Sequence, residues 1–190
     1  MKPHFIALAA LAAASLIAFA QPNNRLPAPW MVAGESPTRY EAGKDADGNQ
    51  TGSKGAIYLR HANGGADSWA TVMQQFNAEH YRGKRVRFQA DVMTLKLTRW
   101  AGLWMRVDSH GRPSAFYNSQ DKPLSGTTQW VTHSVVLDVD NDADTISIGL
   151  IGGGSGTSEM RNLRVEVVGK DVPVDHFPNA APQIIKEPVL

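Results

Sequence analysis

The sequence predicts an all-β protein, a two-sheet antiparallel β-sandwich of the jelly-roll type. Three observations predict it. Roughly nine short segments alternate apolar and polar residues with the two-residue period of a half-buried strand. Glycine, proline, asparagine and aspartate cluster between these segments, as they do in turns. No segment has the 3.6-residue apolar period of a helix of ordinary length.

The first part of the chain is predicted to be a signal peptide, residues 1–20. A short basic start precedes an apolar run from Phe5 to Phe19, and Ala18-Phe19-Ala20 has the small-residue pattern of a cleavage site. The run is too short for a membrane span. We therefore expect a periplasmic or secreted protein without a membrane span, in which residues 21–29 are a linker, 30–168 the sandwich and 169–190 a proline-containing tail.

Charge and cysteine content narrow the class further. The chain has 19 Lys and Arg against 18 Asp and Glu, and removal of residues 1–20 takes only Lys2, which leaves 18 against 18. A neutral domain has no electrostatic steering towards nucleic acid, so no nucleic-acid partner is expected. With no cysteine, stability must come from packing rather than from disulfides.

The strands of the first half are predicted from alternation and turn residues. Ile57 and Leu59 alternate with polar neighbours, and Val86, Phe88, Ala90 and Val92 do the same further on. Residues 42–55 form a long polar loop, and residues 78–81 are compatible with one turn of helix. The predicted strands are 30–34, 38–41, 56–61, 69–77 and 85–94.

The second half follows the same pattern. Val131, Val135 and Leu137 are predicted to face inward, and Leu163, Val165 and Val167 alternate in the last strand. Residues 119–128 are predicted to be a long loop, and residues 152–156 a glycine-rich connection. The predicted strands are 99–108, 115–118, 130–139, 146–150 and 162–167.

The segment from Arg99 to Asp108 is the most informative. Ala101, Leu103, Met105 and Val107 alternate as a core face, while the opposite face carries two tryptophans and a charged pair: Trp100, Trp104, Arg106 and Asp108. We interpret that second face as the floor of a shallow binding groove. Two alternatives remain open. A loop covers the rings while Arg106 pairs with Asp108, or Trp104 and Arg106 form an internal cation–π pair.

A sugar suits such a face, because its C–H surfaces stack on flat rings and its hydroxyls bond to planar polar groups. The residues predicted to bind the ligand are Trp104, Arg106, Trp100, Gln74, Asn118 and Gln120. Three residues of other predicted strands, Tyr58, Arg87 and Gln89, are expected to lie on comparable outward faces.

Several motifs in collinear order resemble a known bacterial module. They are residues 81–87 (YRGKRVR), 102–108 (GLWMRVD), 118–127 with Trp130, 137–139 (LDV) and 166–168 (EVV). The resemblance covers about residues 30–168. It is to galactose-binding-like and carbohydrate-binding-module-like jelly rolls that occur alone or attached to helix-turn-helix regulators. It implies this fold far more than any activity.

The chain also departs from the pattern of that module. Residues 117–119 read Tyr-Asn-Ser where Asp-Asn-Met is expected, Lys122 replaces an arginine, and Glu159 stands where a tryptophan usually enters the last strand. A pocket built on that methionine or tryptophan would differ here, so the resemblance does not define the ligand.

Two acidic clusters are candidate sites for a bound calcium ion. Residues 138, 140, 142 and 144 are all aspartates, and Asp45, Asp47 and Asn49 form a second group. Neither has the glycine and glutamate positions of a calcium loop, so we interpret both as solvated turns and expect no cofactor, with structural calcium as the one exception left open. The histidines show no zinc spacing.

The leading hypothesis is an exported, non-catalytic module that binds a glycan or another small polar ligand. It predicts that Trp104→Ala weakens binding without unfolding the domain. An envelope protein–protein interaction domain using the same surface is the alternative. A weak glycoside hydrolase is less favoured, and it would use Asp91 and Asp108 as its two carboxylates.

Overall fold

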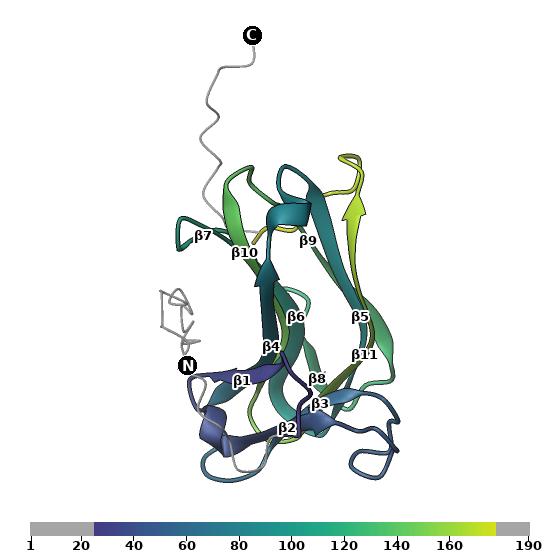
Figure 1. Cartoon of the computed structure of the whole chain (residues 1–190). Helices are drawn as coiled ribbons and strands as arrows, with labels where there is room; N and C mark the ends of the chain where they lie inside the picture. The colour runs from purple at the N-terminus through teal and green to yellow at the C-terminus, as the bar shows by residue number, and fades with distance from the viewer. Residues whose placement is uncertain (1–24, 178–190) are drawn as a thin grey trace, which may run out of the picture.

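The structure is a computed structural model that describes residues 25–177. The predicted signal peptide, residues 21–24 of the predicted linker and residues 178–190 of the predicted tail lie outside this range. Within it, two antiparallel sheets lie face to face (Figure 1). The predicted fold class, a two-sheet β-sandwich, is confirmed.

The six-stranded sheet has the order β1-β4-β10-β6-β7, and β8 pairs with β6. Its strands are β1 (Met31–Gly34), β4 (Trp69–Asn77), β6 (Leu97–Ser109), β7 (Arg112–Tyr117), β8 (Leu124–Gly126) and β10 (Ala143–Gly153). The five-stranded sheet has the order β2-β3-β11-β5-β9. Its strands are β2 (Tyr40–Lys44), β3 (Ile57–His61), β5 (Arg85–Leu95), β9 (Val131–Asp138) and β11 (Thr157–Val168).

The observed elements differ from the predicted ones mainly at their ends. β8 lies inside the predicted loop 119–128. Its three residues are too few to show an alternating pattern, and they form a strand by pairing with β6. β10 is longer than predicted at both ends and takes in Gly152 and Gly153, which pair with β4. The predicted helical turn is confirmed as a short 3-10 helix, η2 (Glu79–Tyr81), and another, η1 (Pro37–Arg39), precedes β2.

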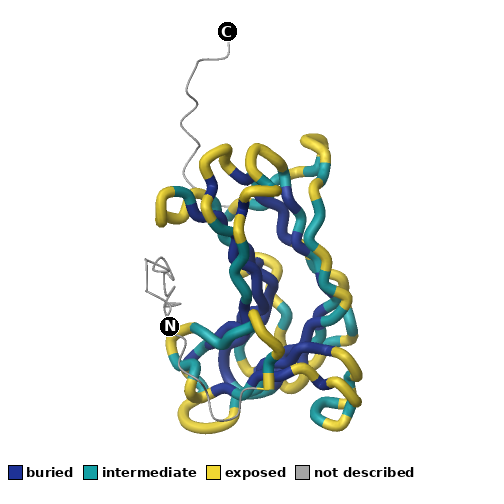
Figure 2. The backbone as a smooth tube through the Cα atoms, viewed as in Figure 1, coloured by how far each residue is buried: buried dark blue, intermediate teal, exposed yellow. Residues whose placement is uncertain are grey.

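The core lies between the sheets, where the inward residues of both alternate patterns meet. Val72, Leu103 and Ile148 of the six-stranded sheet belong to the same buried cluster as Phe88 and Met160 of the five-stranded sheet. Figure 2 shows the buried stretches following the strands and the exposed stretches gathering in the connecting loops. Burying each such side chain contributes about 1.5–3 kcal/mol to the stability of the fold. This packing supplies the stability of a chain that has no disulfides.

The chain after β11 closes one edge of the sandwich. The backbone N–H of Asp175 donates to the carbonyl oxygen of Val136 at 2.9 Å, and the carboxylate of Asp175 accepts from the N–H of Val136 at 2.9 Å. Phe177 then packs its ring against Phe116 and Tyr117 of β7. This segment therefore contacts both sheets. Within residues 25–177, no helix has the length and apolar character needed to cross a membrane.

Candidate functional site

The outer face of the six-stranded sheet carries a second apolar cluster, separate from the core. Strand register places Trp104 of β6 beside Gly149 of β10, which lies beside Met73 of β4, which in turn pairs with Met31 of β1. Buried and half-buried side chains pack together across these strands: Met31, Ala33, Trp69, Met73, Trp100, Trp104, Phe116 and Ile151. We call these eight residues the aromatic face.

Trp104 is the buried centre of the aromatic face. Its indole lies over Gly149, where a Cβ would come within 2.7 Å of the indole Nε1. The Nε1–H donates to the hydroxyl oxygen of Thr71 at 2.6 Å, across the width of β10. Only 3% of Trp104 is exposed. The prediction that this ring lies open on a groove floor is therefore wrong, and the indole supports the face from within.

Arg106 and Asp108 follow Trp104 on the same face. The Arg106 Nε donates to an Asp108 carboxylate oxygen at 3.0 Å, and their side chains are 15% and 8% exposed. The pairing expected under the alternative interpretation is thus present, but it is largely buried instead of lying on the surface. With its charge matched in this way, Arg106 is less suited to an anionic ligand than an unpaired arginine.

Gln74 does not lie on this face. It pairs with Ile148 of β10 and has the parity of Val72 and Phe76, whose side chains pack against the core. Its neighbour Gln75 faces outward instead and donates to the hydroxyl of Ser147 at 3.2 Å. The placement of Gln74 with the tryptophans is therefore wrong, because the sequence could not decide which of two adjacent glutamines faces out.

Asn118 and Gln120 lie on the loop between β7 and β8. Asn118 is 4% exposed, and its side-chain oxygen accepts from the backbone N–H of Gln120 at 3.1 Å, while Gln120 is exposed. The loop passes over Gly102 of β6, where a Cβ would come within 3.2 Å of the Asn118 carbonyl oxygen and 3.4 Å of Trp100. Asn118 thus shapes the surroundings of Trp100 through a buried loop turn.

A pocket of this face lies beside Trp100, four residues along β6 from Trp104. Gly153 pairs with Trp69 of β4, and since Gly152 pairs with Ala101, Gly153 also lies beside Trp100 of β6. The residues that line the pocket are Trp69, Arg99, Trp100, Ile151 and Gly153. Two half-buried indoles thus flank a glycine floor. Of the six predicted ligand residues, Trp100 is the one that lines this pocket.

Trp69, Arg99 and Gly153 were missed by the sequence interpretation. Trp69 begins its strand, and Gly153 stands in a glycine run that is typical of a flexible connection. The available signal was the parity of Trp69 with Thr71 and Met73 in one alternating strand. That signal becomes useful only when the strand order places β10 between β4 and β6.

The other outward residues lie on the opposite side of the molecule. Tyr58 is buried on the five-stranded sheet, and Arg87 pairs there with Glu166 at 2.8 Å. Asp91 accepts from Thr132 on the same sheet, whereas Asp108 belongs to the six-stranded sheet. Tyr58, Arg87 and Gln89 therefore do not join the tryptophans. Asp91 and Asp108 cannot act as a pair of catalytic carboxylates, because they lie on opposite faces of the sandwich.

Two buried carboxyl groups lie near the loop that follows β2. Burial raises the pKa of Asp45, but hydrogen bonds from the backbone N–H groups of Thr51, Gln50 and Gly48 outweigh it and lower that pKa to about 2. Glu159 of β11 is 1% exposed, and neither of its carboxyl oxygens has a hydrogen-bond partner within the described residues. Burial raises the pKa of Glu159, and the nearby hydroxyls only partly oppose this shift.

The acidic clusters are engaged in other interactions. Asp138 pairs with Arg85 and Lys170, Asp142 contacts His110, and both oxygens of Asp45 accept hydrogen bonds within the loop. Across residues 25–177, no group of three or more His, Cys, Asp or Glu side chains is arranged to hold a metal ion.

Fold and site together define a jelly-roll β-sandwich with an aromatic pocket on one outer face. No protein-family model matches the chain. The sequence is 34% identical, over 162 residues, to the uncharacterized HTH-type transcriptional regulator YbfP of Bacillus subtilis (strain 168). The match covers 84% of this chain and 54% of that regulator, so the chain spans about half the length of this relative.

Solved structures with the same fold include a CBM4, that is, a family 4 carbohydrate-binding module. It is 17% identical, with a TM-score of 0.50 over 73% of this chain and 86% of that one. The enzymatically active domain of bacteriophage CBA120 tailspike protein 4 is 13% identical, with a TM-score of 0.53 over 74% of this chain and 20% of that one. The predicted resemblance to such sandwiches, and to a module attached to helix-turn-helix regulators, is confirmed.

Proposed function

We propose that this protein is an exported, non-catalytic module that binds a glycan, with one sugar ring held between Trp69 and Trp100 above Gly153. The observation that carries the proposal is the pocket itself, since two half-buried indoles from β4 and β6 flank a residue without a side chain. This proposed site keeps Trp100 from the predicted groove, which was formed by Trp100, Trp104 and Arg106, and replaces the other two residues by Trp69 and Gly153.

The spacing of the strands suits a single ring. Adjacent strands lie about 4.8 Å apart, so the backbones of Trp69 and Trp100 are separated by about 10 Å, with β10 between them. Gly153 itself adds no side chain to the space between the two tryptophans. Apolar C–H faces of a sugar stack on flat indoles, and Arg99 at the pocket supplies donors for a hydroxyl or an anionic group.

The contacts that hold the aromatic face in place favour a binding site that is already formed before the ligand binds. Trp104 is fixed by its hydrogen bond to Thr71, and Asn118 is fixed by the loop turn over Gly102. A rigid pocket loses little conformational entropy on binding, which suits a shallow site that gains little buried area. The similarity in fold to a CBM4 is consistent with this role.

Affinity electrophoresis on a panel of soluble polysaccharides tests the proposal. We expect at least one polysaccharide to retard the wild-type protein, and Trp69→Ala and Trp100→Ala to weaken that binding at least roughly tenfold, equivalent to about 1.4 kcal/mol. Trp130→Ala is the matched control, because Trp130 stacks on Arg161 of the five-stranded sheet and lies away from the pocket.

The result that would overturn the proposal is binding that does not depend on Trp69 or Trp100, or no retardation by any polysaccharide. Recovery of one protein partner through the same two tryptophans, with every polysaccharide inactive, would support the interaction-domain alternative instead. Unfolding measurements on each variant separate loss of binding from loss of fold.

A further inference from the structure

The charge of the pocket comes from one side chain. Of the residues that line it in the described part of the chain, only Arg99 is charged. The aliphatic part of Arg99 lies beside the glycine run, with its Cβ within 3.7 Å of where a Gly153 Cβ would be and its Cγ within 2.9 Å of that of Gly154. The glycines therefore leave room for Arg99 at the pocket.

Arg99 has no carboxylate partner within residues 25–177. Its Nη1 donates to the backbone carbonyl oxygen of Asp67 at 2.8 Å, a neutral acceptor that fixes the side chain without matching its charge. By contrast, four other strand arginines each contact a carboxylate within 3.0 Å: Arg60, Arg85, Arg87 and Arg106. A guanidinium has five N–H donors, so most of those of Arg99 stay available to a ligand.

An anchored, uncompensated guanidinium beside two indoles has a definite preference. The indoles contact the C–H face of a sugar ring, and the guanidinium pairs best with a planar carboxylate through two parallel hydrogen bonds. The partly buried setting strengthens that pairing relative to bulk water.

We infer that the glycan is acidic, and that Arg99 binds a carboxylate on the sugar ring held between Trp69 and Trp100. The inference rests on the proposed function and names the chemical class of its ligand. It also assigns Arg99 as the residue that distinguishes charged from neutral sugars.

The test compares each acidic polysaccharide with its own neutral form. Polygalacturonate, alginate and hyaluronate are each paired with the same polymer after its carboxyl groups have been reduced to alcohols. We expect at least one acidic polymer to bind at least tenfold more tightly than its reduced counterpart. Arg99→Gln should remove that difference, and Arg99→Lys should keep part of it.

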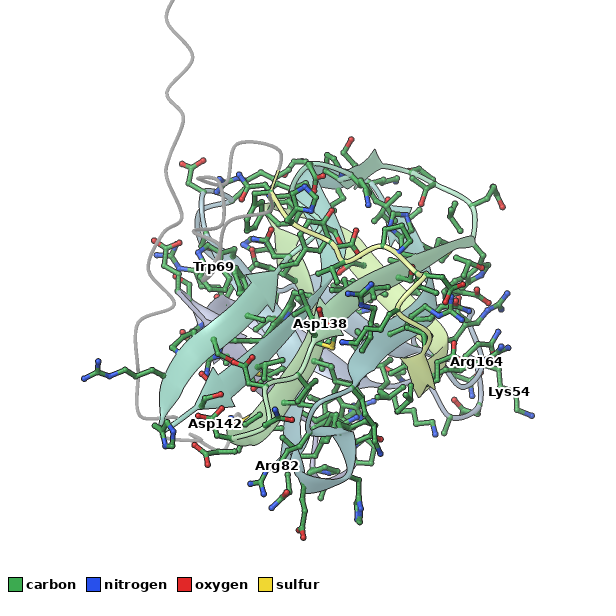
Figure 3. All side chains as sticks on the ribbon, turned by 90° about the horizontal axis from the view of Figure 1, so that it is seen from above. Lys54, Trp69, Arg82, Asp138, Asp142 and Arg164 are labelled. Atoms are coloured by element: carbon green, nitrogen blue, oxygen red, sulfur yellow. The ribbon has the colours of Figure 1, made fainter. Side chains whose placement is uncertain are left out.

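Arg164→Gln is the matched control, because it changes the net charge by the same amount. Arg164 is exposed on the five-stranded sheet and lies on the opposite side of the molecule from Trp69 (Figure 3). It should keep the preference for the acidic polymer. An equal loss in Arg99→Gln and Arg164→Gln would reveal a general charge effect and overturn the inference.

The two proposals fail in different ways. If neutral polysaccharides bind through Trp69 and Trp100 and no acidic polymer binds better than its reduced form, the inference about Arg99 is wrong and the glycan-binding function stands. If no polysaccharide, acidic or neutral, binds in a manner that depends on the two tryptophans, the proposed function is wrong as well.

Discussion

The outer faces of the two sheets are built from equally alternating strands, yet their side chains are used differently. On the five-stranded sheet, charged residues neutralise one another across neighbouring strands. Arg85 contacts Asp138 at 2.9 Å, Arg87 contacts Glu166 at 2.8 Å, and Arg60 contacts Glu41 at 2.7 Å. Its partly buried tryptophan, Trp130, stacks on Arg161 with 4.0 Å from guanidinium carbon to ring centroid.

On the six-stranded sheet, the indoles lie against glycines instead. Trp104 covers Gly149, and Trp69 lies within about 3 Å of where a Gly34 Cβ would be. Gly153, by contrast, lines a pocket together with Trp69 and Trp100. The comparison teaches that an outward position is a candidate for binding only where its neighbours leave it unpaired and uncovered.

Removing the Trp104 indole should have the largest effect on stability. Trp104→Ala deletes a buried side chain and leaves Thr71 without its donor, so we expect a loss of about 3–5 kcal/mol in the free energy of unfolding. Trp130→Ala, on the other sheet, should cost much less because that ring is partly exposed. Urea denaturation measures both. Equal losses in the free energy of unfolding of the two variants would contradict the difference between the two outer faces.

Two glycines of β10 provide the next sharpest test. A Cβ at Gly149 would come within 2.5 Å of the Val72 carbonyl oxygen, so Gly149→Ala should cost about 1–3 kcal/mol. At Gly153 the nearest atom lies at 3.6 Å, so Gly153→Ala should leave stability nearly unchanged while its methyl group narrows the pocket. Denaturation should therefore show a loss of stability in Gly149→Ala, whereas glycan affinity should fall in Gly153→Ala. Weak glycan binding by Gly149→Ala alone would contradict the placement of the site.

These glycines also show what the sequence could predict. Alternation correctly predicted the sandwich, the outward parity of Trp100, Trp104 and Arg106, and most of the inward faces. Val131 and Val167 are the exceptions, since they lie near strand ends and are 44% and 51% exposed. It could not show that Trp104 would be buried, because that burial depends on Gly149 lying in the neighbouring strand.

Strand order limited the prediction of the pocket in the same way. Trp69 and Trp100 belong to strands that do not pair with each other, and β10, which lies between them, comes later in the chain than both. Gln74 and Gln75 are chemically identical, so only the register with Ile148 decides which one faces the core. Local pattern thus predicted faces, whereas pairing between distant segments determined the site.

Glu159 is the exception on the five-stranded sheet, since its buried carboxyl has no hydrogen-bond partner in the described chain. Burial raises its pKa above 4.5, so the folded state holds a proton that the unfolded state has lost. Stability should therefore fall as pH rises from 4.5 through the raised value. Glu159→Gln should remove that decline. Denaturation midpoints measured from pH 4 to 8 test this prediction. The same pH dependence in the wild-type protein and in Glu159→Gln would contradict it.

Asp45 should give the opposite dependence. Although burial raises its pKa, the N–H donors of the loop hold it at about 2, below the usual 3.8, so the stability it contributes is present above pH 3.8 and lost as pH falls towards 2. Asp45→Asn should reduce the acid-induced loss in that interval. Thermal unfolding between pH 2 and 5 measures it, and an unchanged slope would show that the loop does not depend on this carboxylate.

The smallest effect is expected at a neutralised pair. The Arg87–Glu166 contact is partly exposed, so a double-mutant cycle with alanine at both positions should give a coupling of about 0.2–1 kcal/mol, and neither variant should alter glycan binding. A coupling well above that range, or a loss of binding, would mean that the five-stranded face has a role beyond structural support.

The most direct measurement follows the indole N–H signals of the five tryptophans by NMR during titration with an oligosaccharide of the polymer that binds. Our account predicts that the signals of Trp69 and Trp100 shift in a saturable manner while that of Trp130 does not move. Shifts at Trp130 with none at Trp69 and Trp100 would place the ligand on the wrong face of the sandwich and contradict the account.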